Sequence, residues 1–406
     1  MRKGLIAVLA MMAVVAALLP QASAAQPRRS YIVVLKAGSD PGSVSAEHAS
    51  RFGASVDYLY RHALKGYAGM MSASAADRIA ADSRVAWVQR NKTVKIAAQT
   101  LPTGINRVDA DLSPTANIDG VDDRVDVDIA IIDTGIDIEH PELNVLAAVQ
   151  KNCIGSGESA EDGHGHGSHV AGTAAAIDNN AGVVGMAPGA RLWAVRVLNN
   201  AGFGSTASVV CGIDYVTAHA DEIEVANMSL GGGGSDDNNC GLTNFDAEHQ
   251  AICASVAAGV TYAVAAGNDS DNAANHIPAA YNEVMTVSAL ADFNGQPGGG
   301  APSTCYPEQD DTRADFSNFG PDVDLTAPGV CIASTFKNGG FNNTFSGTSM
   351  ASPHVAGAAA LLLVRRPNLT PAQVRIGLMR LGNLNYTFPD DDPDGVKEKL
   401  LSAKLI

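Results

Sequence analysis

The sequence lacks several features that would place it in other classes of protein. Its six cysteines include no paired C-x-x-C spacing, which disfavours a cysteine-rich zinc site. After the N-terminal segment, no apolar run is long enough to span a bilayer. Positive charge is scarce, with 27 Lys and Arg against 43 Asp and Glu, whereas phosphate backbones attract basic surfaces. We therefore expect no nucleic-acid partner.

The N-terminal segment has the pattern of a secretory signal peptide. Two basic residues precede an apolar run that ends at Leu19, and the small-residue pattern A-S-A ends at Ala24. The run is short for a membrane span, which disfavours a retained anchor. The sequence thus predicts a signal peptide over residues 1–24 and an extracellular protein that has no membrane association after cleavage.

Secretion changes the interpretation of the six cysteines, because oxidising compartments favour disulfides. Many connectivities are open to six cysteines. Proximity along the chain favours the pairs Cys240–Cys253 and Cys305–Cys331, and the remaining pair is then Cys153–Cys211.

The charge is divided unevenly along the chain. Residues 25–97 hold 11 Lys and Arg against 5 Asp and Glu, whereas residues 98–406 hold 14 against 38. A basic module joined to an acidic body predicts that the two attract each other. A charged surface that keeps a secreted protein soluble is the alternative, and both explanations can hold.

Residues 25–97 predict a small α+β module. Pro102 and Gly104 break any regular element in the segment that follows, so we interpret 97–111 as a linker or processing zone. The expected elements are, in order, strand 31–36, helix 43–60, strand 62–71, helix 74–85 and strand 87–96.

From residue 125 onward, apolar strands alternate with helices. Strands that are apolar throughout indicate a parallel sheet covered by helices on both faces, in which ligands bind beyond the carboxyl ends of the strands. The predicted strands are 125–135, 190–198, 224–230, 260–268 and 283–290, and the predicted helices are 167–177, 205–220, 244–259 and 352–366.

Polar residues follow these strand ends and could carry nucleophilic catalysis. Asp133 and Asn268 each end a strand, a run of histidines opens one helix, and Ser349 stands between a glycine-rich turn and another helix. A serine hydroxyl needs a neighbouring base, and that base needs an orienting carboxylate. The intermediate then needs donors for its oxyanion, which an amide and a helix N-terminus can supply.

Each of these residues also has another interpretation. Histidines 164, 166 and 169 have the spacing H-x-H-x-x-H of some zinc hydrolases, although that motif would want an acid at Ser168. Asp133 and Asn268 could serve turns. Ser349 could be only a helix N-cap, with Ser346 and Ser352 as rival nucleophiles.

Five blocks, IIDTGID, HGHGSHVAGT, NMSLGG, AAGN and GTSMASPHVAG, resemble those of the subtilase family, the subtilisin- and proteinase K-like secreted serine proteases. The order Asp, His, Ser along the chain also matches that family. The resemblance covers about residues 126–367, and residues 25–97 resemble its inhibitor propeptide, which implies a small α+β module of the ferredoxin-like type. It implies a subtilisin-like parallel twisted sheet and a serine endopeptidase domain over 98–406, made as an autoprocessed precursor.

The resemblance also implies individual roles. Asp133, His166 and Ser349 would form the triad, Asn268 would bind the oxyanion, and His169 would be structural. Ser168 stands where the family more often has Thr, a departure that keeps the hydroxyl. An extended peptide would lie along a groove formed by Ser229, Leu230, Gly231, Gly202, Ala266 and Gly267.

Partners and ions follow from the same resemblance. It implies protein or peptide substrates, binding of the chain's own propeptide, a monomer and no cofactor for catalysis. Cleavage near 95–99, KIAAQ, would suggest small apolar residues before the cut, whereas Asp269 beside Asn268 would favour basic ones.

Structural calcium stays open, because subtilases often bind it. Asp390, Asp392 and Asp394 resemble the start of an EF-hand loop, but Leu401 stands where its final acid is expected, so a solvated acidic turn is the alternative.

Overall fold

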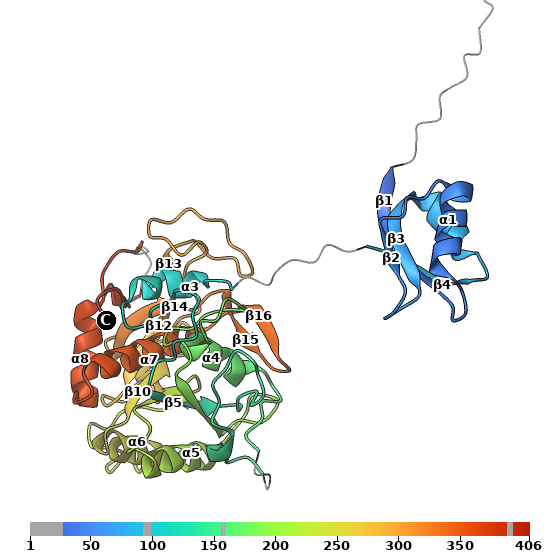
Figure 1. The fold of residues 1–406 in the computed structure, drawn as a ribbon. Coiled ribbons are helices and arrows are strands. Elements are labelled where there is room, and N and C mark those ends of the chain that lie inside the picture. Colours follow the sequence, from blue (N-terminus) through green and yellow to red (C-terminus); the bar gives the residue numbers. More distant parts are fainter. Residues whose placement is uncertain (1–26, 92–98, 156, 158, 388–392) are drawn as a thin grey trace, which may run out of the picture. The chain divides into compact units, whose positions relative to one another are not determined.

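The computed structural model describes residues 27–91, 99–155, 157, 159–387 and 393–406 (Figure 1). The chain divides into two compact units, Met1–Ile96 and Ala97–Ile406, and each is described by itself. The predicted signal peptide lies outside the described residues, as does most of the KIAAQ segment. Among the described residues, no helix combines the length and apolar character needed to cross a membrane.

The N-terminal unit has the element order β-α-β-β-α-β, which confirms the ferredoxin-like expectation. Its sheet has the strand order β2-β3-β1-β4 with antiparallel neighbours. The core lies between the sheet and the two helices and contains Val33, Tyr67 and Ile79. The elements are β1 Arg28–Leu35, α1 Pro41–Phe52, β2 Tyr58–Tyr60, β3 Gly66–Ser72, α2 Ala73–Ala80 and β4 Val85–Arg90.

The helix predicted over 43–60 was too long. It begins after the N-cap Asp40 and ends at Phe52, because Gly53 adopts a left-handed conformation (φ 68°) that closes the last turn. The chain then enters the edge strand β2, whose pairing with β3 overrides its helix-like pattern.

The C-terminal unit is built on a nine-stranded sheet with the order β17-β14-β12-β10-β8-β5-β7-β6 and β13 added beside β12. All neighbours are parallel except β12 and β13, which confirms the predicted parallel sheet. Its strands are β5 Asp128–Asp133, β6 Lys151–Asn152, β7 Arg191–Arg196, β8 Val225–Met228, β10 Thr261–Ala265, β12 Met285–Ala291, β13 Thr312–Arg313, β14 Val323–Pro328 and β17 Lys399–Leu400.

Helices and two small sheets surround this large sheet. The helices are α3 Thr103–Arg107, α4 His166–Ala175, α5 Thr206–Ala218, α6 Ala247–Ala257, α7 Thr348–Arg365 and α8 Pro371–Leu381, with 3-10 turns at Ala110–Leu112, Ala147–Val149 and Ala273–Asn275. The small antiparallel sheets pair β9 Gly232–Gly233 with β11 His276–Ile277, and β15 Ile332–Phe336 with β16 Gly340–Phe345.

Both faces of the large sheet are covered, as the all-apolar strands predict. Successive side chains of a strand point to opposite faces. Accordingly Ile129 and Ile131 belong to the core that α4 and α7 complete, whereas Ala130 and Ile132 belong to the core that α5 and α6 complete. Figure 1 shows β5 and β10 between these two pairs of helices.

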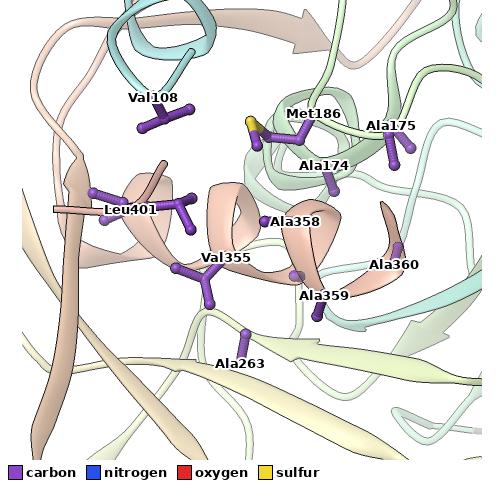
Figure 2. Close-up of a cluster of buried hydrophobic side chains, with 14 of the residues drawn as sticks. Val108, Ala174, Ala175, Met186, Ala263, Val355, Ala358, Ala359, Ala360 and Leu401 are labelled. Atoms are coloured by element: carbon purple, nitrogen blue, oxygen red, sulfur yellow. The ribbon is translucent and has the colours of Figure 1, made fainter. Parts of the chain in front are cut away.

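Small residues let α7 pack close to its neighbours. Figure 2 shows Ala358 of α7 facing Ala174 of α4, and Val355 facing the sheet. A Cβ on Gly357 would lie only 2.3 Å from the Cβ of Met186 and 2.8 Å from the carbonyl oxygen of Ala174. Glycine is therefore required at this crossing, which sets the position of the helix that carries Ser349.

Three disulfides join the two cysteine pairs that proximity along the sequence favours and the pair that then remains. They connect Cys153 with Cys211, Cys240 with Cys253 and Cys305 with Cys331, and no described cysteine is free.

Candidate active site

Asp133 and His166 meet at the carboxyl end of β5. Asp133 is the last residue of that strand and is fully buried, and His166 is the first residue of α4. The imidazole Nδ1 lies 2.8 Å from the carboxylate Oδ1, and the same oxygen accepts the backbone N–H of Thr134 at 2.7 Å. The carboxylate therefore fixes the orientation of the ring and favours the tautomer with the proton on Nδ1.

The backbone of Gly167 packs closely against Gly135, which lets His166 reach Asp133. A Cβ on Gly167 would lie 2.0 Å from the carbonyl oxygen of Gly135 and 3.2 Å from Oδ1 of Asp133. Any larger residue would push the start of α4 away from the end of β5. In the H-G pair, the histidine therefore contacts Asp133, and the glycine allows the close packing that this contact needs.

Two opposing effects act on the pKa of His166. Burial lowers it, whereas the negative charge of Asp133 and the hydrogen bond to it raise it. The raising effects dominate, so the pKa lies above the ordinary value of 6.5.

Ser349 lies in the first turn of α7, directly after Thr348. The N-cap of this helix is Gly347 (φ 154°), which has no side chain, so Ser349 is not the cap of its helix. The Ser349 hydroxyl donates to the carbonyl oxygen of Ser229 at 3.3 Å rather than to His166. Catalytic hydrogen bonds are often absent or long without substrate and tighten when it binds.

The two rival serines are engaged elsewhere. The Ser346 hydroxyl accepts the backbone N–H of Cys331 at 3.0 Å. Ser352 is fully buried, and its hydroxyl lies 2.9 Å from that of Ser229. Ser349 lines a cavity described below, and neither rival does.

Asn268 is oriented by the residue that precedes Ser349. Its side-chain oxygen accepts the backbone N–H of Thr348 at 2.8 Å and the Thr348 hydroxyl at 3.0 Å. The amide NH₂ group has no hydrogen-bond acceptor among the described residues. Asn268 and Ser349 line the same cavity, so this group and the N-terminus of α7 can both serve an anion there.

Two adjoining cavities lie beside these residues and share the wall from Leu230 to Gly233. One, of about 490 Å³, is lined by Ser349, Asn268, Gly267, Ala266 and Asp269 among others. The other, of about 440 Å³, is lined by His166, Gly202, Ser229, Val209 and Glu248 among others.

All six predicted groove residues lie along these two cavities. Ser229 differs from the other five because its side chain makes a hydrogen bond to α7. Its hydroxyl donates to the carbonyl oxygen of Ser349 at 2.8 Å, so this side chain fastens the groove to α7. Asp269 lines the cavity of Ser349, but its side chain is 67% exposed and lies 3.6 Å from Nδ1 of His276.

The three neighbouring histidines make separate contacts and do not converge on one point. His166 faces Asp133, whereas Nε2 of the fully buried His169 lies 2.9 Å from the carbonyl oxygen of Ile332. Burial lowers the pKa of His169 to about 3, which keeps this ring neutral. His164 lines the cavity of His166. This arrangement favours the triad over the zinc interpretation.

Two other groups of side chains in the described part of the chain have metal-ligand spacing. One contains Cys240 and Cys253, whose sulfurs are already joined in a disulfide. The other contains Asp236, Asp237 and His249, but the Asp237 carboxylate accepts four backbone N–H groups. Calcium prefers oxygen ligands, so neither group fits it. Of the acidic tail, Asp390 and Asp392 lie outside the described residues.

The sequence reasoning missed three residues that shape the site. Thr348 orients Asn268, and Asp162 accepts hydrogen bonds from the Thr134 hydroxyl and from the backbone N–H of Gly165, at 2.8 Å each. Glu248 lines the groove from α6. The acid just before the H-G-H-G run was a signal for Asp162, but no local pattern indicated that Glu248 faces the groove.

Comparisons with known proteins agree with this geometry. The sequence model of the subtilase family matches residues 125–387, and that of peptidase inhibitor I9 matches residues 30–97. Subtilisin DY from Bacillus licheniformis is 38% identical over 282 residues, which cover 68% of this chain and 90% of that protein. The extracellular serine proteinase of Thermus sp. (strain Rt41A) is 38% identical over 334 residues, or 80% of this chain and 73% of that one.

A solved structure is also similar. The crystal structure of a cold adapted subtilisin-like serine proteinase superimposes with a TM-score of 0.56 and 32% identity, covering 76% of this chain and 99% of that one. Fold, site and relatives together define a serine endopeptidase. The chain belongs to the subtilase family and carries an I9-type propeptide domain.

Proposed function

We propose that this protease cuts proteins through a triad of Ser349, His166 and Asp133, with Asn268 as an oxyanion donor. The observation that carries the proposal is the 2.8 Å contact between His166 and Asp133, beside the cavity that Ser349 lines. Subtilases need no cofactor for this chemistry.

The reaction would proceed in two steps. Ser349 attacks the peptide carbonyl while Nε2 of His166 accepts its proton, and Asp133 stabilises the resulting imidazolium. The amide of Asn268 and the backbone N–H of Ser349 stabilise the oxyanion. His166 then gives its proton to the leaving amine, and water releases the acyl group from Ser349 by the same route.

The groove residues would hold the peptide main chain. Gly202, Ser229, Leu230, Gly231, Ala266 and Gly267 line the two cavities and leave room for an extended strand.

We further propose a precursor with a signal peptide at 1–24, an inhibitor and folding aid at 25–97 and a monomeric peptidase at 98–406. The precursor would be secreted and would cut itself at the boundary between the last two. The opposite charges of the two units support mutual binding, and the extracellular relative supports secretion. A slow-folding parallel sheet gives a folding aid a physical purpose. Calcium as a structural ion stays a prediction.

Labelling with a fluorophosphonate probe tests the proposal. The processed protein should take up one phosphonyl group on Ser349, located by mass spectrometry of its peptides, because only an activated hydroxyl displaces the leaving group. A His166→Ala variant should not be labelled. A folded, processed protein that resists the probe would contradict the triad.

Replacing Asn268 by Ala should lower kcat by about 10²–10³ and change KM little, because the amide acts on charge that develops only in the transition state. Steady-state kinetics on a peptide substrate measure both constants. The Asn268→Asp variant separates the two roles of this side chain, since it keeps the oxygen that Thr348 contacts but loses the donor. A rise in KM with unchanged kcat would instead assign Asn268 to substrate binding.

A further inference from the structure

One acidic side chain in the groove has no role in the triad. Glu248 lines the cavity that His166 also lines, and only 5% of it is exposed. No described residue gives its carboxylate a hydrogen bond or an ion pair. Glu248 donates a hydrogen bond to Asp246, but through its backbone N–H. A carboxylate that the protein leaves unpaired at a cavity wall favours a cationic group in that cavity over a neutral one.

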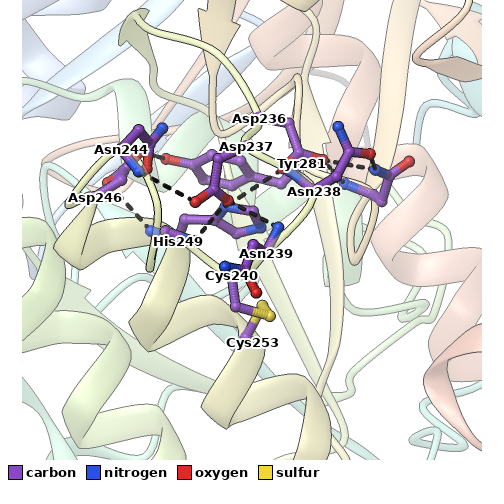
Figure 3. A network of polar contacts seen from close by, with 12 residues as sticks. Asp236, Asp237, Asn238, Asn239, Cys240, Asn244, Asp246, His249, Cys253 and Tyr281 are labelled. Carbon is purple, nitrogen blue, oxygen red and sulfur yellow. Dashed lines mark hydrogen bonds and ion pairs between the residues drawn. A yellow bond between two sulfur atoms is a disulfide. The ribbon is translucent and has the colours of Figure 1, made fainter.

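Several contacts fix the start of α6, where Glu248 lies. Asp246 caps α6 by accepting the backbone N–H groups of Glu248 at 3.0 Å and His249 at 3.3 Å. The Tyr281 hydroxyl donates to the other oxygen of Asp246 at 2.6 Å, and the rings of Tyr281 and His249 stack with centroids 4.1 Å apart. Figure 3 shows this network above the Cys240–Cys253 disulfide.

The surroundings of Glu248 disfavour the charged form of its carboxylate. Burial, followed by the charge of Asp246, raises the pKa of Glu248 to about 7. An acid in the first turn of a helix is ordinarily favoured in its charged form by the helix dipole. Here burial outweighs that effect, which indicates that no positive group of the described chain compensates the charge.

We propose that Glu248 makes this cavity select a basic side chain, Lys or Arg, of the bound peptide. This inference rests on the proposed function of the groove. The apolar residues Val209, Leu230 and Ile277 also line the cavity and can cover the aliphatic stem. The charged end would then meet the carboxylate in a charge-assisted hydrogen bond.

The arrangement of the two cavities suits one extended peptide. They share the wall from Leu230 to Gly233. In the proposed function, the cavity lined by Ser349 would receive the residue next to the attacked carbonyl. Alternate side chains of an extended peptide lie about 7 Å apart on the same side. A residue further along the acyl side of the scissile bond therefore reaches Glu248.

Positional peptide scanning tests the proposal. Lys, Arg, Gln or norleucine is placed in turn at each of several acyl-side positions, and kcat/KM is measured for each peptide. At one position beyond the residue next to the cut, Lys and Arg should be preferred over norleucine by about tenfold at pH 8, the effect of about one charge-assisted hydrogen bond. Absence of a basic preference at every such position would overturn the proposal.

A matched pair of variants assigns the preference. In Glu248→Gln, which keeps the size of the side chain, the Lys-to-norleucine ratio should fall close to one. In Glu222→Gln, which makes the same charge change at an exposed site outside the groove, the ratio should remain as in the parent. An unchanged ratio in Glu248→Gln would sink the assignment even if the parent prefers basic residues.

The pH dependence of the same ratio is a second readout. It should rise as the pH increases through about 7, because Glu248 is then ionised. The charges of Asp246 and Tyr281 act on Glu248, and burial keeps the Tyr281 pKa far above this range. His164 and His166 also line the cavity. A charged histidine there would act on the Lys peptide and not on the norleucine peptide, so the pH profile is also measured in Glu248→Gln, where a dependence that comes from Glu248 should be lost. A protein that cuts no peptide and resists the fluorophosphonate would refute the proposed function, whereas a labelled, active protein with a flat ratio would refute only this inference.

Discussion

A Ser349→Ala precursor is expected to remain uncut, and its separately matured form should show kcat lowered by about 10⁶-fold. The hydroxyl of Ser349 is the group that would form the acyl-enzyme, and the serines at 346 and 352 are engaged in other hydrogen bonds. Gel analysis of the secreted precursor and a peptide assay measure the two effects.

Two controls separate chemistry from folding in this experiment. Ser303→Ala removes an exposed hydroxyl from the same unit and should leave processing and activity unchanged. Addition of parent enzyme to the Ser349→Ala precursor should cut it at the normal junction, provided that it is folded. Normal self-processing by Ser349→Ala would show that another residue is the nucleophile.

An Asp133→Asn variant should lose about 10⁴-fold in kcat, the second largest effect. The Asp133 carboxylate accepts both the Thr134 backbone N–H and the His166 ring at its Oδ1 atom. An amide in its place cannot stabilise the imidazolium and can present an N–H to the ring, which favours the wrong tautomer.

The pH profile provides a second readout for Asp133. His166 must be neutral to accept the serine proton, so kcat/KM should fall as the pH drops through its pKa, which lies above 6.5. In Asp133→Asn the raising charge is gone while burial still lowers the pKa, so this limb should move to lower pH. Asp221→Asn, an exposed change of the same kind, should not move it. A limb that stays in place would contradict the pairing.

Local patterns predicted much of the sheet and of the site. Strands with an apolar run that points to both faces, such as Asp128–Asp133 with its Ile-Ala-Ile-Ile centre, indicate that both faces are covered. The doubly covered parallel sheet therefore followed from these runs and their alternation with helices. Asp133 and Asn268 were recognisable because polar residues at strand ends meet at one edge. Choosing His166 among three histidines required the family resemblance, because spacing alone also allowed zinc.

Other features depended on contacts that the local patterns did not show. The helix after Asp40 stops at Phe52, where Gly53 closes its last turn, and residues 58–60 then pair with β3. The helix-like pattern of 43–60 did not reveal this pairing. Likewise, the orientation of Asn268 comes from Thr348, 80 residues later in the chain.

The sequence by itself determined the alternation of strands and helices, the family and the residue types of the proposed triad, because these depend on short-range patterns and on motif order. Only the tertiary structure decided that Glu248 faces the groove and that the Ser349 hydroxyl contacts the Ser229 carbonyl. The physical reason is that the direction of a side chain depends on how whole helices pack. For α6 this packing is set by the disulfide at Cys253 and by the contact of Tyr281 with the Asp246 cap.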